Sequence, residues 1–452
     1  MFYNIINSER RSGDSATVMN PRTNEALWEV TVAHETNLND AVKSARVSFE
    51  LWKLLSLEER QRYLLKLADE LEQRRDEIHA PLAAETGKSS LLANMEIDDT
   101  LTFIRFNASQ SLPDKVEYEN DKLKIVSTHH PIGMVGAICP WNFPLVLAVT
   151  KIAAALVMGN CIIVKSSPFT PCATSKLAEL ATSVLPRGVL QVLNGDNEVG
   201  RLLTIHPGID KISFTGSIAT GKKVAESAAR TLKRVTLELG GNDASVVCPD
   251  VDVKTVAAQV AAGVYVHQDI FEEFRDSFVE AVKDIKIDPS GDQSPLFSPI
   301  QNKMQYKLVK DLIADCRKKN YTLLCGGNTD DKHPGLFIAP VVVDQPPHDS
   351  RIVQLEQFGP IIPLTKWSTE VEMISMVNGT DTGLGGCVWV QNVDNAERIA
   401  RKLEVGAVWI NSAEAPNPYG YLSGWKQSGI GGEWGNQGLL SYSHTQTIQL
   451  CK

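Results

Sequence analysis

The chain has 452 residues, of which 43% are hydrophobic and 22% are charged, and its formal net charge is −9. This length exceeds one ordinary hydrophobic core, so we expect two or more lobes, and the composition is that of a soluble globular protein. The negative charge argues against nucleic acid and anionic membranes as partners.

The N-terminal part of the chain is predicted to be mainly helical. Residues 1–14 lack the apolar core of a signal peptide, so we expect a cytoplasmic protein. Between 36 and 110, apolar side chains recur at helical spacing, which predicts helices there. Residues 121–129 alternate between apolar and polar side chains and predict an edge strand.

From Pro131 onward, short apolar runs alternate with helical segments. The predicted strands are 136–138, 161–164, 189–193, 211–214 and 234–237, and the predicted helices are 145–158, 174–183 and 220–229. This alternation is typical of a parallel sheet covered on both faces. The helix 145–158 is apolar on most sides and should be buried, but it is too short, and interrupted by Lys151, to span a bilayer.

A second α/β region is predicted in the C-terminal half. Its predicted helices are 271–282, 306–318 and 394–402, with Asp394 as an N-cap, and its predicted strands are 341–343, 361–362, 386–390 and 405–410. Residues 424–438 are predicted to form a glycine-rich loop, and residues 443–450 a strand.

The cysteine pattern predicts neither disulfides nor a metal site. None of the eight cysteines forms a CxxC pair, and no histidine lies at zinc-finger spacing from them. We therefore expect reduced and mostly buried thiols that pack in the core.

One glycine-containing turn is a candidate phosphate site. Residues 214–221 read Phe-Thr-Gly-Ser-Ile-Ala-Thr-Gly and join a predicted strand to a predicted helix. Gly216 lets the backbone approach a phosphate, and the helix N-terminus supplies free N–H groups and a positive dipole end. The alternative is an ordinary strand–turn–helix without a ligand.

Three further motifs carry candidate chemistry, each with a plainer alternative. Asn142, held between Pro140 and Pro144, points to an amide donor for an oxyanion, but it could instead cap the following helix. Glu238, before two glycines, fits a partly desolvated general base, whereas most glutamates are surface charges. Lys165 ends a predicted strand, where α/β ligands bind, but a solvated lysine is the alternative.

The strings Pro-Trp-Asn-Phe-Pro at 140–144, Phe-Thr-Gly-Ser at 214–217, Glu-Leu-Gly-Gly at 238–241 and Glu-Gln-Phe-Gly-Pro at 356–360 occur in this order. Together they resemble the aldehyde dehydrogenase family across almost the whole chain. The resemblance implies an α/β fold with a Rossmann-type cofactor domain, an α/β catalytic domain and a small β oligomerisation arm. It places the cofactor domain at 1–120 and 132–240, the catalytic domain at 241–423, and the arm and tail at 121–131 and 424–452.

The resemblance also implies oxidation of a small aldehyde to a carboxylic acid, NAD or NADP as cofactor, and a homodimer or homotetramer. Glu238 and Asn142 would be catalytic. Lys165 would hold the adenosine ribose, with Pro168 where relatives often carry an acid, so that a 2′-phosphate would meet no repulsion there. Glu356 would hold the nicotinamide ribose, although its Gly-Pro context also fits a plain turn. The full set of implied cofactor residues is Ile138, Trp141, Lys165, Pro168, Gly195, Phe214, Gly216, Ser217, Gly221, Leu239, Glu356 and Phe358.

The family's nucleophilic cysteine has no counterpart in this chain. Relatives carry an aromatic-x-Asn-x-Gly-Gln-x-Cys run after the helix that follows Glu-Leu-Gly-Gly. Here Val253, Val256, Ala257, Val260 and Ala261 predict that helix, and the strand 264–267 begins directly after Gly263. Helix-to-strand connections usually take about 2–6 residues, so we expect an abnormally tight join. On the order of fifteen residues are missing relative to the motif.

Three interpretations follow from the missing segment. The chain is a mis-spliced or mispredicted version of an active enzyme, or a catalytically inactive nucleotide-binding protein that pairs with an active homologue, or a chain that does not fold. The intact flanking motifs favour the first, with Ser166 in place of a proline and an insertion at 421–423 as the other departures.

Overall fold

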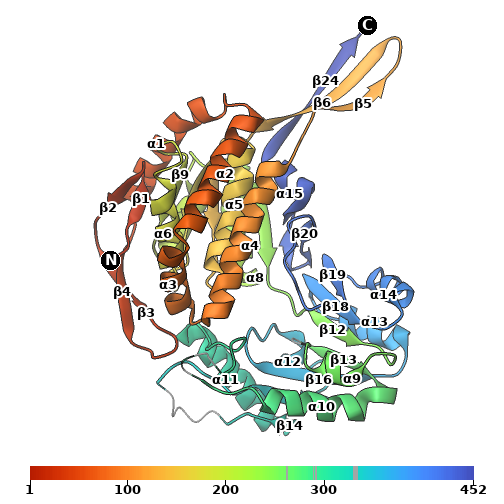
Figure 1. The fold of residues 1–452 in the computed structure, drawn as a ribbon. Coiled ribbons are helices and arrows are strands. Elements are labelled where there is room, and N and C mark those ends of the chain that lie inside the picture. Colours follow the sequence, from red (N-terminus) through yellow and green to blue (C-terminus); the bar gives the residue numbers. More distant parts are fainter. Residues whose placement is uncertain (261–262, 289, 291–292, 329–333) are drawn as a thin grey trace.

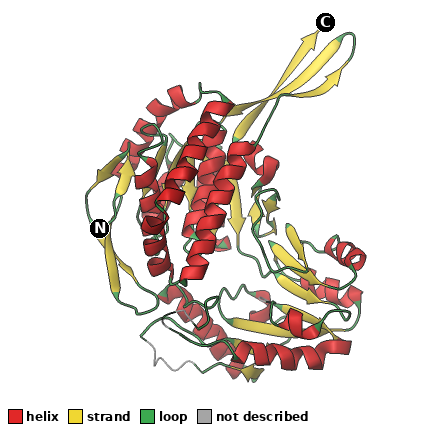
Figure 2. Cartoon of the chain, viewed as in Figure 1, coloured by secondary structure: helices red, strands yellow, loops and turns green. Residues whose placement is uncertain are grey.

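The computed structural model describes residues 1–260, 263–288, 290, 293–328 and 334–452. Two α/β lobes, each built around one large sheet, lie beside each other, and a narrow β-ribbon projects from the first lobe (Figure 1). Strands alternate with helices through both lobes (Figure 2), and the predicted α/β class is confirmed.

The first lobe contains an eight-stranded sheet with the order β2-β1-β9-β8-β7-β10-β11-β22. Its parallel centre confirms the five strands predicted there: β7 (Met134–Ile138), β8 (Cys161–Lys165), β9 (Leu190–Leu193), β10 (Lys211–Gly216) and β11 (Arg234–Leu239). The antiparallel edge strands, which are too short for a periodic signal, were not predicted: β1 (Asn4–Ile6), β2 (Glu9–Arg11) and β22 (Gly429–Ile430).

Helices cover both faces of this sheet (Figure 1), and the predicted helical regions are confirmed. They are α1 (Glu35–Trp52), α2 (Leu57–Gln73), α3 (Arg75–Thr86), α4 (Ser90–Ser109), α5 (Pro144–Val157), α6 (Cys172–Ala181) and α8 (Ile218–Ala229), together with the unpredicted α7 (Asn197–Ile205). All residues of α5 are buried, as its apolar composition predicted, and this includes Lys151.

The second lobe contains a seven-stranded sheet with the order β14-β15-β16-β13-β12-β18-β19. Its strands are parallel except for β14, and they are β12 (Ala244–Val247), β13 (Val264–His267), β14 (Thr322–Cys325), β15 (Val341–Asp344), β16 (Ile361–Trp367), β18 (Gly385–Trp389) and β19 (Ala407–Ile410). Its helical segments are α9 (Val253–Ala257), a 3-10 turn (Gln268–Ile270), α10 (Phe271–Lys283), α11 (Lys303–Lys318), α12 (Arg351–Gln354), α13 (Glu370–Asn378) and α14 (Val393–Ala400).

The N-cap predicted for α14 is wrong by two residues. Asn392 is the N-cap, and its side chain accepts hydrogen bonds from the backbone N–H groups of Asp394 and Asn395. Asparagine and aspartate compete as equally good caps, and the helix begins one residue earlier than its apolar periodicity indicated.

The abnormally tight join predicted before β13 is also wrong. Helix α9 ends at Ala257 and does not continue through Val260, so residues 258–263 connect it to β13. Val260 is buried although it lies outside the helix, which explains why its apolar character extended the predicted helix. Ala261, also predicted on this helix, lies outside the described residues. The connection therefore has an ordinary length, because the helix is short.

The projecting ribbon has the strand order β24-β6-β5 and is antiparallel throughout. It consists of β5 (Lys115–Glu119), β6 (Leu123–Pro131) and β24 (Ser443–Cys451), which confirms the strands predicted near 121–129 and 443–450 and adds β5. Two further hairpin strands, β3 (Ser15–Met19) and β4 (Ala26–Thr31), flank the first lobe.

The tail before β24 is more structured than the predicted loop. It contains β20 (Leu422–Ser423), β21 (Trp425–Lys426), β22, β23 (Gly432–Glu433) and α15 (Gly435–Leu440), and β21 pairs with β17 (Thr382–Gly383). Because β22 pairs with β11, the tail ties the C-terminal segment to the first sheet. Among the described residues, none of the helices combines the length and the apolar character that crossing a bilayer requires.

Candidate active site

Glu238 lies near the carboxyl end of β11, opposite Thr215 of β10. The Thr215 hydroxyl donates a hydrogen bond of 2.9 Å to Glu238 Oε2, and Glu238 is only 8% exposed. Burial raises the pKa of Glu238, Glu433 raises it further, and Lys151 opposes the rise. The surface-charge alternative is therefore excluded, and a buried carboxylate with a raised pKa suits proton transfer near neutral pH.

A buried ion pair supports Glu238 from behind. Lys151 Nζ donates to both carboxylate oxygens of Glu433, at 2.9 and 2.8 Å, and to Thr215 Oγ1 at 2.8 Å. Burial alone would lower the pKa of Lys151, but Glu433 and Glu238 outweigh it and the pKa is raised. Since Thr215 accepts from Lys151 and donates to Glu238, one continuous hydrogen-bonded chain runs from Glu433 to Glu238.

Lys151 and Glu433 were missed as site residues in the sequence. Lys151 was noted only as an interruption of the apolar helix, although a lone charge in a buried helix needs a partner and so signals one. Glu433 lies 282 positions away in the sequence, and no local pattern marks it.

Asn142 lies in the loop between β7 and α5. It does not cap α5, so the alternative role predicted for it is wrong. The N-cap is Phe143, without a side-chain bond, and Pro144 occupies the first turn. The N–H groups of Leu145 and Val146, which have no acceptor within the helix, donate to Glu96 Oε1 at 2.9 and 3.3 Å. Asn142 Oδ1 is buried and has no hydrogen-bond partner in the described part of the chain. The Asn142 side chain thus does not cap the helix, and its Nδ2, not this oxygen, is the atom that would donate to an oxyanion.

The carboxyl ends of β7, β10 and β11 bring several predicted cofactor residues together. Phe214 pairs with Ile138, and Gly216 with Leu239. A Cβ on Gly216 would lie 2.7 Å from Phe214 Cζ, and one on Gly221 would lie 2.5 Å from Leu239 Cδ2, so a side chain at either position would require its neighbour to shift. Ser217 is the exposed N-cap of α8, and its side chain accepts from Thr220 N–H.

Lys165 and Gly195 follow at the ends of the next two strands. Lys165 is 4% exposed, and burial lowers its pKa to about 8, so the solvated-lysine alternative is wrong. Pro168 is exposed in the loop after β8. Gly195 is buried, and a Cβ there would lie 2.5 Å from Val199 Cγ2.

The second lobe contributes Glu356 and Phe358 from the loop between α12 and β16. Glu356 lies against Gly240, where a Cβ would be 2.0 Å from its Oε2, and burial raises its pKa to about 7. Phe358 packs edge-on against Trp141 of the first lobe with ring centroids 5.1 Å apart. The loop is therefore more than a turn, because its side chains contact both the Trp141 loop of the first lobe and the glycines that follow β11.

The cysteines of the chain offer no obvious reactive thiol at this site. Cys139 directly precedes Pro140, but it is buried, its Sγ lies 4.0 Å from the Leu147 carbonyl oxygen, and burial raises its pKa to about 12. Six of the eight cysteines are buried, Cys325 is intermediate, and the exposed Cys451 lies on the ribbon. A thiolate is the reactive form, and burial of this kind disfavours it.

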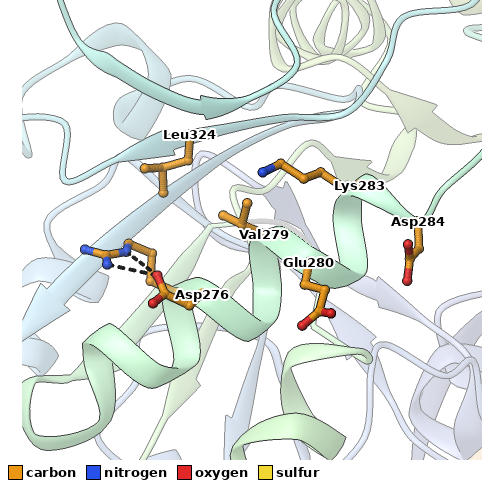
Figure 3. A pocket seen from close by; sticks show the side chains of 7 residues that line it. Asp276, Val279, Glu280, Lys283, Asp284 and Leu324 are labelled. Carbon is orange, nitrogen blue, oxygen red and sulfur yellow. Dashed lines mark hydrogen bonds and ion pairs between the residues drawn. The ribbon is translucent and has the colours of Figure 1, made fainter.

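A separate pocket of about 530 Å³ lies between α10 and β14 (Figure 3). Its side chains include Arg275, which pairs with Asp276, and Lys283. None of the predicted catalytic or cofactor residues lines this pocket, so it is separate from the candidate active site.

The parallel sheet, the buried Glu238 carboxylate and the glycines at the strand ends are typical of α/β enzymes that bind a dinucleotide. The Aldehyde dehydrogenase family model matches residues 8–448. The chain is 42% identical over 466 residues to a putative aldehyde dehydrogenase, FUS7, of Gibberella fujikuroi, covering 100% of this chain and 99% of the relative. It is 34% identical to retinaldehyde dehydrogenase 3 of Homo sapiens, covering 100% and 92%.

Among solved structures, an NAD+ complex of the aldehyde dehydrogenase from Bacillus cereus superposes with a TM-score of 0.95 at 31% identity, covering 100% of this chain and 96% of that one. A betaine aldehyde dehydrogenase from Staphylococcus aureus in complex with NAD+ gives a TM-score of 0.94 at 28% identity, covering 99% and 94%. The chain belongs to the aldehyde dehydrogenase family.

Proposed function

We propose that this chain is an NAD(P)-dependent aldehyde dehydrogenase whose nucleophile segment is missing between Gly263 and Val264. The observation that carries the proposal is the buried chain of hydrogen bonds that ends at Glu238. With a cysteine supplied by the missing segment, its thiolate would attack the aldehyde carbon. Asn142 would donate to the oxyanion, NAD(P)+ would accept the hydride, and Glu238 would take a proton from the water that releases the acid.

Two observations support a missing segment as opposed to a relocated nucleophile. The alignment with the Gibberella fujikuroi relative spans 466 positions against 452 residues of this chain, a difference of 14. The cysteine nearest in sequence to the Asn142 loop, Cys139, is buried with a raised pKa. Loss of the nucleophile in another enzyme class costs about 10⁶ in kcat, so we expect this exact chain to turn over very slowly.

The structure supports the N-terminus of α8 as the pyrophosphate site by comparison with its neighbours. Glu96 binds the first N–H groups of α5, Glu85 binds those of Cys172 and Ala173 on α6, and Asp196 caps α7. Among these four crossover helices, α8 differs because no carboxylate of the described residues binds its first N–H groups: its cap is the neutral Ser217, and its first turn carries no acidic residue. An anion is therefore favoured there and repelled at the other three.

The choice between NAD and NADP rests on the loop after Lys165. Pro168 occupies the position where the resemblance would place an acid, and it is exposed. A 2′-phosphate on the adenosine ribose would meet no carboxylate from that position, so we propose that either cofactor binds. We also propose a cytoplasmic location, which imaging of a fluorescent fusion would test.

The first test is cofactor binding without turnover. We expect the purified chain to bind NADH, detected by the change in nucleotide fluorescence, and to form no NADH from NAD+ and a panel of aldehydes. NADH formation that Glu238→Gln abolishes would show instead that this exact chain is active. Sequencing the transcript across the codons for Gly263 and Val264 then separates a faulty chain from a genuine one, since an extra in-frame segment with a cysteine marks an ordinary enzyme.

The alternative function is a catalytically inactive nucleotide-binding subunit of an active homologue. The retained network around Glu238 and the open α8 site are compatible with it. Transcripts that all join Gly263 to Val264, together with a mixed oligomer recovered on co-expression, would favour this alternative over the first proposal.

We also propose that the β5–β6–β24 ribbon mediates assembly into a dimer or tetramer. Ile448 and Leu450 on one face of β24 are 40% and 50% exposed, which is unusual for apolar side chains on a free edge strand. We expect Ile448→Lys with Leu450→Lys to shift the mass measured by light scattering toward the monomer. Gln449→Lys, on the opposite face of the same strand, is the matched control and should leave the mass unchanged.

A further inference from the structure

A buried ion pair between Lys88 and Glu96 lies next to the Asn142 loop but outside the catalytic set. Glu96 is 1% exposed, and its Oε2 accepts from Lys88 Nζ. Gly87, with a φ of 73°, ends α3 and turns the chain toward Lys88. A Cβ on Gly87 would lie 2.7 Å from both Pro21 and Pro299, so the turn that places Lys88 requires a glycine.

This pair holds both sides of the junction between the loop and α5. Glu96 Oε1 accepts from the N–H groups of Leu145 and Val146, at 2.9 and 3.3 Å. Lys88 Nζ lies 3.6 Å from the ring centroid of Phe143, the N-cap residue. Asn142 directly precedes Phe143, so the ion pair contacts the neighbouring side chain of Asn142 through Lys88 and the backbone three and four residues further along through Glu96.

A helix cap alone would not need the lysine. Glu85 likewise accepts from two N–H groups of α6, one on each carboxylate oxygen, at 2.6 and 2.8 Å, and it forms no ion pair with any described residue. The extra element at α5 is Lys88, and its contact beyond Glu96 is with the residue next to the predicted oxyanion donor. The contact that distinguishes the α5 cap from the α6 cap is therefore the one between Lys88 and the loop that carries Asn142.

We propose that Lys88 and Glu96 are positioning residues. They hold the Asn142 amide within hydrogen-bond reach of the place that the oxygen of a bound aldehyde would occupy. The catalytic meaning of this placement rests on the proposed function, whereas the placement itself does not. A displacement of a catalytic group by about 1 Å can lower a rate 10²-fold. Loss of the contact one residue from Asn142 is therefore expected to have a large effect on the rate.

The test uses the local signal of Trp141, the residue before Asn142. The chain has eight tryptophans, so the protein labelled with 5-fluorotryptophan gives eight ¹⁹F resonances, and Trp141→Phe assigns the one of interest. We expect Lys88→Met and Glu96→Gln each to move the Trp141 resonance, while those of Trp389 and Trp409 in the second lobe stay in place. Lys88→Arg keeps the charge and should return the Trp141 resonance toward its parental position.

The control is Arg201→Met, which breaks the exposed Arg201–Glu198 pair of α7 and should move no resonance. An unmoved Trp141 signal in folded Lys88→Met and Glu96→Gln proteins, with a lowered melting temperature, would overturn the proposal and leave the pair as a structural cap. If Lys88→Met does not fold, the position of the Trp141 resonance in Glu96→Gln decides the question.

A kinetic arm applies to the form of the protein that carries the cysteine segment, if transcripts encode it. There we expect both variants to lower kcat by about 10²-fold, because the amide of Asn142 would no longer be held in one position. Absence of NAD+ binding or turnover in the parent would refute the proposed function, and the ¹⁹F result would still decide the positioning role.

Discussion

Replacing Lys151 by methionine is expected to lower the free energy of unfolding by about 3–5 kcal/mol. Lys151 is fully buried, and its ammonium group is the partner of both carboxylate oxygens of Glu433. Methionine fills similar space but leaves Glu433 buried with only the Ser213 hydroxyl as a donor. Urea unfolding followed by circular dichroism measures the change.

Two further variants separate the ion pair from other effects of the substitution. Lys151→Met combined with Glu433→Gln removes both charges, so most of the lost stability should return. Lys402→Met breaks a more exposed ion pair, with Glu370, and should change stability by no more than about 1 kcal/mol. A loss of less than about 1 kcal/mol for Lys151→Met itself would contradict the assigned role of the pair.

The same substitution reaches the proposed general base. Lys151 and the hydrogen bond from Thr215 both oppose the rise in the pKa of Glu238, so the removal of Lys151 should raise that pKa further. Thr215 would also lose the donor that orients its hydroxyl toward Glu238. In a form of the protein that turns over, the rise in rate with pH should therefore move to higher pH, because Glu238 must be deprotonated to accept a proton.

The sequence predicted the parallel strands of the first lobe because each is a short apolar run, and four of the five are followed by a polar residue. It predicted Glu238, Lys165 and Gly216 as site residues because they lie at the carboxyl ends of these strands, where ligands of α/β proteins bind. It did not predict the partner of Lys151, because Glu433 comes from a two-residue strand in the tail whose place depends on the whole fold.

Local capping signals failed for a related reason. Asn142 is a favourable N-cap residue in sequence, but the N–H groups at the start of α5 are bound by Glu96 from another helix. The short α9 shows the same limit, since Val260 is buried by its surroundings and not by continuation of the helix. In each case a tertiary contact supplies what the local pattern assigned to a neighbouring residue.

Replacing Ser217 by aspartate is expected to weaken NAD+ binding by at least tenfold. Aspartate is a good N-cap and complements the helix dipole, so α8 should remain folded and at least as stable. Its carboxylate would, however, give α8 the negative charge that Glu96, Glu85 and Asp196 give the other three crossover helices. Two like charges about 4 Å apart repel by about 4 kcal/mol at an effective dielectric constant near 20, and tenfold in affinity requires only about 1.4 kcal/mol.

Ser217→Asn is the matched control, because asparagine has the same shape and capping ability as aspartate without the charge. We expect it to bind NAD+ within about twofold of the parent, and we expect the affinity of the aspartate variant to fall further for NADP+ only if the 2′-phosphate also approaches α8. Calorimetric titration of both variants with both cofactors measures these differences. Equal affinities of the aspartate and asparagine variants would show that the pyrophosphate does not lie at α8, and would remove the N-terminus of this helix from the proposed cofactor site.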